Sequence, residues 1–317
     1  MTVIIAVSLI APAAMPAAAE EPETADDYFN ELRAMDGLEI YGEYSELETV
    51  HIQSLSAVQV GDFTEQQARE LDAIIATIRL FEDAQAQYEA DEFEAGFETA
   101  AEIEAEIDKL ETYDESLAAL STLALTRYYE QLSDELAAQA EATDNTPDEI
   151  ELREMAASAS EGANDPNQAA EYTRQAEQLS AELGADRERM NDAEAAIDSF
   201  SDTCSACESP ISAIGTHGID VVGHYETSLS VTPALSDAVQ RAERHGLSDR
   251  QATLEAQSET AWAVQLSLGI ASSMVLLGYG VLIAFIVGLV TSRLFAWKRA
   301  FEAANLDSVI TVGDRNV

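Results

Sequence analysis

The stretch TAWAVQLSLGIASSMVLLGYGVLIAFIVGLVTS, residues 260–292, carries no charge over 33 residues and decides the architecture of this chain. A helix needs about 20 apolar residues to cross the hydrocarbon core of a bilayer. The only two tryptophans, Trp262 and Trp297, lie near the two ends of the run, and such amphipathic rings favour the headgroup layers. The sequence therefore predicts one membrane-spanning helix, with Trp262 and Trp297 as interface anchors.

Charged residues at the two ends of the run predict its direction through the membrane. Arg293, Lys298 and Arg299 follow the run, whereas Glu259 precedes it. Basic residues close to a span stay on the cytoplasmic side. We therefore expect residues 302–317 to form a cytoplasmic tail, and the long N-terminal part to lie outside the cell. Arg293, Lys298 and Arg299 would then anchor the span at the inner interface.

The N-terminus agrees with this direction. Residues 2–19 are apolar and end in three alanines, as in a secretory signal peptide cut after Ala19. The usual basic n-region is missing, so either the start lies further upstream or the signal is atypical. Pro12 and Pro16 disfavour a second permanent span. The expected parts are a signal peptide (1–19), an acidic helical ectodomain (20–200), a neutral Cys/His-containing segment (201–247), a juxtamembrane and transmembrane helix (248–301) and the tail (302–317).

The charge of the chain is strongly unbalanced. It has 60 acidic and 16 basic residues, a net charge of −44, and lysine only at Lys109 and Lys298. Such a field repels nucleic acid, so we expect no nucleic-acid partner. Self-repulsion weakens a compact state in ordinary saline, whereas molar salt shortens the screening length to about 3 Å. The composition resembles that of proteins from extreme halophiles, and we expect a high-salt environment.

Apolar residues recur at helical spacing through most of residues 24–250, which argues against a disordered acidic segment. We predict an all-α fold, in which an extracellular bundle of antiparallel helical hairpins is joined to one C-terminal transmembrane helix. The clearest apolar stripes are Leu71, Ile74, Ile75, Ile78 and Phe81, and Leu117, Leu120, Leu123, Tyr128, Leu132 and Leu136. Expected helix caps are Thr64, Thr112 and Thr146, and expected breaks lie near Asp91, at 162–165 and at Gly184. No proline or glycine interrupts residues 249–268, so the last outer helix should enter the span without a joint.

One short segment has the composition of a chemical site. Both cysteines and three of the four histidines fall within 42 residues, namely Cys204, Cys207, His217, His224 and His245. Between Thr203 and Ser236 the only charged residues are Glu208, Asp220 and Glu226, and none of them is basic. This near-neutral stretch stands out in so acidic a chain, and it is the place where we expect chemistry.

Three interpretations of this segment remain open. An oxidising compartment favours a structural disulfide between Cys204 and Cys207, which would close only a short turn. Alternatively, two thiolates together with His217 and His224 would suit tetrahedral zinc or another transition metal. Copper sites more often include a methionine, and none is nearby. Thiol–disulfide exchange is disfavoured because no lysine or arginine is close enough to stabilise a thiolate, and covalent haem would require histidine in place of Glu208.

Among the remaining titratable residues, the sequence indicates no catalytic residue. An acidic cluster is formed by Glu92, Glu94, Glu102, Glu104 and Glu106. In a chain with 60 acids such clusters arise without a site, so we interpret this one as a solvated helix face. His51 is expected to pack or to cap a helix. The chain contains no G-x-S-x-G, H-E-x-x-H, P-loop or dinucleotide fingerprint.

Small residues mark one face of the predicted span. Gly280, Ala284 and Gly288 recur at intervals of four, and such a face lets a second helix approach closely. Glycine and alanine are also common in membrane helices, so ordinary lipid contact is the alternative. The expected partners are therefore the lipid bilayer and either a second copy of the chain or a membrane partner subunit.

These observations lead to two functional hypotheses of different classes. The first is a non-enzymatic, single-pass surface protein with an acidic helical ectodomain, which acts through protein contacts and needs no cofactor. The second is a membrane-anchored metal-binding or redox accessory subunit that uses residues 204–224. A sensory ectodomain is disfavoured, because a tail of residues 302–317 is too short for a signalling domain.

Overall fold

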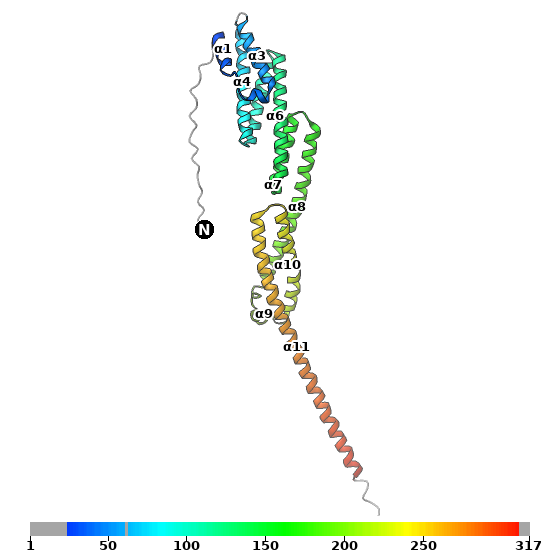
Figure 1. The fold of residues 1–317 in the computed structure, drawn as a ribbon. Helices are drawn as coiled ribbons and strands as arrows, with labels where there is room; N and C mark the ends of the chain where they lie inside the picture. The colour runs from blue at the N-terminus through cyan, green and yellow to red at the C-terminus, as the bar shows by residue number, and fades with distance from the viewer. Residues whose placement is uncertain (1–23, 61–62, 311–317) are drawn as a thin grey trace, which may run out of the picture. The chain divides into compact units, whose positions relative to one another are not determined.

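The computed structural model describes residues 24–60 and 63–310, with side chains as far as Glu302. In these ranges the chain is all α-helical and contains no strand, which confirms the predicted class (Figure 1). The predicted signal peptide lies outside the described residues. The elements are α1 (Ala25–Ala34), α2 (Ile40–Glu43), α3 (Ser45–Gln59), α4 (Glu65–Glu89), α5 (Phe93–Glu111), α6 (Glu115–Ala142), α7 (Thr146–Gly162), α8 (Pro166–Thr203), α9 (Pro210–His217), the 3-10 turn η1 (Gly218–Asp220), α10 (Val221–Arg244) and α11 (Ser248–Ile310).

The helices form two compact units. The first unit contains the described residues up to Ala142 together with Ile150–Ala176. The second contains Thr143–Glu149 and the residues from Glu177 onward. Helices α7 and α8 contribute residues to both units.

The first unit is built on helices that pack along one another across short turns. Helix α4 packs against α5, α5 against α6, and α6 against α3. The predicted stripe on α4 is buried throughout, and the α6 stripe is buried at Leu117, Tyr128, Leu132 and Leu136. Leu123 is 49% exposed, so its assignment to the core was wrong. It lies on the exposed face of α6, because it is five residues before Tyr128, a spacing that turns it away from the buried face of a helix with 3.6 residues per turn.

Two predicted helix starts are shifted, because another side chain takes the cap. At α6 the carboxylate of Asp114 accepts hydrogen bonds from the backbone N–H groups of Ser116 (2.8 Å) and Leu117 (3.1 Å). Thr112 instead ends α5, and its hydroxyl donates to the carbonyl of Lys109. At Thr64 the predicted cap is confirmed, since its side chain accepts from the Gln67 N–H.

The start of α7 is the second helix start at which another side chain takes the predicted cap. The side chain of Asn145 accepts a hydrogen bond from the Asp148 N–H at 3.4 Å, and the Asn145 carbonyl accepts from Glu149. Thr146 was expected in that role, but its hydroxyl faces His245.

The expected break at Gly184 is also wrong, because α8 continues from Pro166 to Thr203. A glycine inside a helix costs only about 1 kcal/mol relative to alanine, which the packing on either side offsets.

The second unit has its own apolar core. Helix α11 packs along α10, and α9 packs on both of them. The buried apolar residues are Met190, Ala193, Ile197 and Phe200 on α8, Cys204, Cys207 and Ala213 near α9, Val221, Val231, Leu235, Ala238 and Ala242 on α10, and Leu254, Ala261, Leu268 and Ala271 on α11. Gly246, with φ +64°, makes the turn from α10 into α11.

Helix α11 is one uninterrupted helix from Ser248 to Ile310, and it enters the apolar run without a joint, as predicted, but it continues past residue 301, where the tail was expected to begin. It is long and apolar enough to cross a membrane, with a mean hydropathy of 2.5 in its most apolar window, none of which is buried. The beginning of the apolar run is packed in protein, although the sequence predicts the whole run as a membrane-spanning helix. Leu268, Ala271 and Ser272 are buried against the rest of the second unit, whereas every described side chain from Leu276 to Glu302 is exposed.

Candidate functional site

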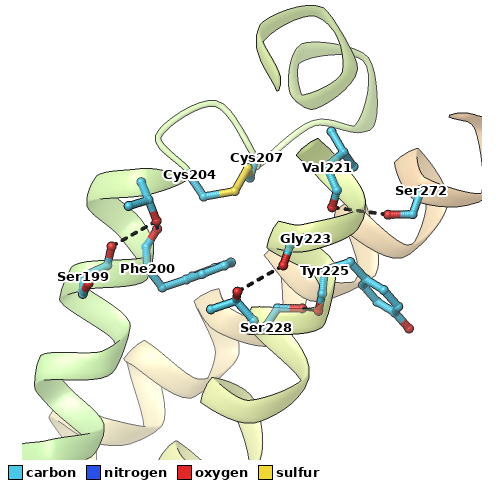
Figure 2. The surroundings of a disulfide bond; sticks show 11 residues. Ser199, Phe200, Cys204, Cys207, Val221, Gly223, Tyr225, Ser228 and Ser272 are labelled. Atoms are coloured by element: carbon cyan, nitrogen blue, oxygen red, sulfur yellow. Dashed lines mark hydrogen bonds between the residues drawn. A yellow bond between two sulfur atoms is a disulfide. The ribbon is translucent and has the colours of Figure 1, made fainter. Parts of the chain in front are cut away.

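The cysteine turn begins where α8 ends. The backbone N–H of Cys204 donates to the Phe200 carbonyl (2.9 Å), and that of Cys207 donates to the Cys204 carbonyl (3.1 Å). These bonds fold the chain back and bring the two Cα atoms within 5.3 Å, so the sulfurs are joined in a disulfide. Figure 2 shows this bond beside the ring of Phe200. Both cysteines are buried and belong to the core of the second unit.

The nearby histidines come from two different elements. His217 ends α9, and Gly218, with φ +57°, turns the chain into η1 before His224 appears in the first turn of α10. The two residues therefore do not share one helix face, as a continuous helix would have required. Their rings nevertheless meet edge to face, with centroids 4.6 Å apart.

A ligand-like group forms around the disulfide. One potential ligand atom each from Cys204, Cys207 and His217 lies within 4.8 Å of the other two. The buried Nε2 of His217 has no hydrogen-bond partner among the described residues. His224 is not part of this group, although the sequence had placed it among the ligands. The disulfide and a metal site exclude each other, because a metal needs both sulfurs as thiolates.

His245, the remaining histidine of the segment, belongs to a different cluster that the sequence did not reveal. Its Nε2 lies 3.1 Å from Oδ2 of Asp186 on α8, and its Nδ1 lies 3.0 Å from the hydroxyl of Thr146 at the start of α7. All three side chains are buried. They join residues 59 and 99 positions apart in the chain, so no local spacing could have indicated the cluster.

Three arginines complete the surroundings of Asp186. Arg241 contacts its Oδ1, Arg189 approaches the same oxygen at 3.2 Å, and Arg244 lies 3.2 Å from Oδ2. Burial by itself raises the pKa of the Asp186 carboxyl, but hydrogen bonds from His245 and Arg241 and their charges outweigh it and lower this pKa below its ordinary value. Asp186 is therefore a buried carboxylate that holds α8, α10 and the start of α7 together.

The chemistry of this cluster is structural. A carboxylate, an imidazole and a hydroxyl in a row are also the elements of a hydrolase triad. In this chain Thr146 is 7% exposed and His245 is 5% exposed, so both side chains are buried. The backbone N–H of Thr146 also donates to the His245 carbonyl (3.2 Å), which ties the two segments together independently of their side chains.

The other predicted residues fall into two groups. His51 is buried, its Nε2 lies 2.7 Å from the Leu32 carbonyl, and its ring stacks on Tyr41, so the predicted packed role is confirmed. The acidic cluster on α5 is exposed apart from Glu106, which is half-buried and paired with Lys109. On α11 the residues assigned to helix packing and to interface anchoring are exposed, and their roles stay predictions. They are Gly280, Ala284, Gly288, Trp262, Trp297, Arg293, Lys298 and Arg299.

No protein-family model, no curated protein and no solved structure matches this chain.

Proposed function

We propose that the chain is a single-pass, membrane-anchored surface protein. Its acidic ectodomain, an extracellular bundle of antiparallel helical hairpins, would serve as a structural or interaction module in a high-salt environment, with residues 302–317 in the cytoplasm. The observation that carries this proposal is α11. It begins in the core of the second unit and continues, without a break, into an uncovered apolar stretch that ends at Arg293.

Two further observations favour a role in contacts over catalysis. The Asp186–His245–Thr146 cluster is buried and binds helices to one another. The cysteine sulfurs are closed in a disulfide, so they offer no nucleophile in this state. The surface of the ectodomain is dominated by carboxylates, which keep a protein soluble in molar salt and repel other anionic surfaces.

Protease shaving of intact cells tests the location and the direction of the span. Trypsin is expected to remove peptides from the ectodomain, for example at exposed Arg69 and Arg174, and to leave Arg299 uncut until the membrane is permeabilised. The physical reason is that basic residues next to a span stay inside. Cutting at Arg299 in intact cells, with the ectodomain untouched, would reverse the orientation. Equal access to both ends would remove the membrane span.

A second function is favoured by the grouping of Cys204, Cys207 and His217. Under reducing conditions the three side chains would provide two thiolates and one imidazole, a donor set that suits zinc. The unpartnered Nε2 of His217 adds to this case. The protein would then be a membrane-anchored metal-binding or redox accessory subunit.

Thiol titration and zinc binding separate the two states. As isolated under oxidising conditions, the protein is expected to show no free thiol and no bound zinc. After reduction with a phosphine, one zinc per chain would support the second function, and His217→Ala should weaken binding by about tenfold or more. His224→Ala is the matched control, because its ring touches His217 but lies outside the ligand group. Failure of the reduced protein to bind zinc would leave a structural disulfide only.

A further inference from the structure

A charge-poor segment lies where α11 leaves the second unit. Figure 1 shows α9 at the end of this unit from which α11 emerges as a single helix. Both α9 and η1 pack on α11. The segment from Thr203 to Ser236 has only Glu208, Asp220 and Glu226 as charged residues, in a chain with a net charge of −44.

Large apolar side chains of this segment face outward. Ile211 on α9 is 79% exposed and Ile219 on η1 is 59% exposed. Ile214, Gly218 and Ile219 also line a groove of about 440 Å³ whose other wall is Val275, Gly278, Tyr279 and Leu282 of α11. The segment therefore lies alongside residues 275–282 of the helix that we propose to cross the membrane.

The length of the apolar stretch shows how deep these residues would lie. Arg293 is the first charge after the stretch and marks the inner boundary of the hydrocarbon core. A span needs about 20 residues, and counting back from Arg293 places the outer boundary near Ser273. Residues 275–282 then occupy roughly the outer 13 Å of the hydrocarbon, at 1.5 Å per residue. The side chains packed beside them lie at the same depth.

We propose that α9 and η1 form a membrane foot, in which Ile211, Ile214 and Ile219 insert into the acyl chains of the outer leaflet. This inference rests on the proposed span and adds a second contact with lipid. The foot is continuous with the exposed apolar surface of α11. Asp220, at the end of η1, is the only carboxylate in the foot, and this low charge fits the same occupant, because a carboxylate is costly to place in hydrocarbon.

The foot would bind lipid by apolar burial alone. It has no lysine or arginine, the residues that attract anionic headgroups. Asp220, next to Ile219, is exposed and would remain at the headgroup level. Apolar insertion is not screened by salt, in contrast to attraction between charges, so it suits a protein that works in molar salt.

The foot also changes which residue meets the outer headgroups. Trp262 lies 11 positions before Ser273 on α11, or roughly 16 Å outside the hydrocarbon boundary at 1.5 Å per residue. The headgroup layers add only about 5–8 Å on each side. The outer anchor is then the foot, whereas Trp297 remains close to the inner interface.

Fluorescence quenching in lipid vesicles tests the foot on the full-length protein. In a background of Trp262→Phe and Trp297→Phe, single tryptophans are introduced as Ile219→Trp and Ile211→Trp, both at exposed positions. Phe285→Trp reports the span, and Leu229→Trp, exposed on α10, is the matched control in the same unit. The vesicles are phosphatidylcholine with or without bromine on the acyl chains, and acrylamide is the aqueous quencher.

The foot predicts that Ile219→Trp and Ile211→Trp lose emission to brominated chains nearly as strongly as Phe285→Trp, and resist acrylamide. Leu229→Trp should show the opposite behaviour, because it lies eight residues, or about 12 Å, beyond Val221 on α10. Retention of the Cys204–Cys207 disulfide and of helical circular dichroism checks the fold of each variant. Because there are two foot probes, a single misfolded variant does not decide the outcome.

Three results would overturn the foot, and they differ in what else they remove. If Phe285→Trp is quenched by bromine and both foot probes are quenched only by acrylamide, the span stands and the foot fails. If the foot probes resist both quenchers, a protein partner covers this surface instead of lipid. If Phe285→Trp itself is not quenched by bromine, the proposed span fails, and the foot fails with it.

Discussion

Replacement of Asp186 with alanine is expected to destabilise the second unit by about 3–5 kcal/mol, the usual cost of removing one partner from a buried ion pair. The Asp186 side chain is 8% exposed, and its loss leaves Arg241, at 16% exposure, without its buried counter-charge. It also leaves the imidazole of His245 without its carboxylate. Urea unfolding of the full-length protein in detergent and molar KCl measures this change.

The matched control is Asp237→Ala. Asp237 pairs with the same Arg241, its Oδ2 lying 2.8 Å from Nε, but its side chain is 56% exposed. Exposed pairs contribute about 0–1 kcal/mol. Equal effects of the two substitutions would show that Asp186 acts only as another surface charge.

The effect of Asp186 also depends on pH in a definite direction. Its pKa is lower in the folded protein than the ordinary value of about 3.9, because the hydrogen bonds and charges of His245 and Arg241 outweigh the effect of burial. The carboxylate therefore adds stability above about pH 4, and this contribution is lost as the pH falls through the folded-state pKa. The difference between wild type and Asp186→Ala should shrink over that range. A constant difference would contradict the assigned pairing.

Loss of salt is expected to unfold the two helical units. With 60 acidic and 16 basic residues, 44 negative charges have no positive charge to balance them. If each adds only about 0.2 kcal/mol of repulsion, the sum of about 9 kcal/mol is comparable to the whole stability of a domain, about 5–15 kcal/mol. Molar salt shortens the screening length from about 10 Å to about 3 Å and removes most of this cost. Helical circular dichroism of the full-length protein in nonionic detergent, followed against KCl concentration, measures the loss.

Two controls identify repulsion as the cause. At low salt, lowering the pH to about 4.5 protonates many carboxylates and should restore helix, because their ordinary pKa values are about 3.9–4.3. Asp186 itself stays charged at that pH, since its pKa is lowered. A neutral osmolyte strengthens burial without screening charge and should restore much less. A melting temperature that does not change between low and molar KCl would remove the high-salt interpretation.

The sequence predicted what depends on local spacing. The helical period of apolar residues predicts a helix wherever it occurs, so the all-α class, the stripe on α4 and the continuous α11 could be predicted. Caps were less secure, because several polar residues compete within one turn. Asp114 and Asn145 each accept the capping hydrogen bond that had been assigned to a neighbouring threonine.

The remainder depends on contacts between distant residues. Nothing local indicates that Asp186, His245 and Thr146 meet, since they lie on α8, in the turn after α10 and at the start of α7. The sequence also contained no sign that the first part of the apolar run is buried in protein. Leu268 and Ala271 look the same in sequence whether they face lipid or a protein core. Only the packing of α10 against α11 distinguishes the two environments.

The absence of a joint in α11 has a mechanical consequence. The same helix is held by the core of the second unit through Leu254, Ala261 and Leu268, and it ends beyond Arg293. A helix without proline in this range resists bending. If α11 crosses the membrane as proposed, a sideways pull on the second unit would act as a lever and tilt the portion beyond Arg293, so that strain at one face of the bilayer would be felt at the other.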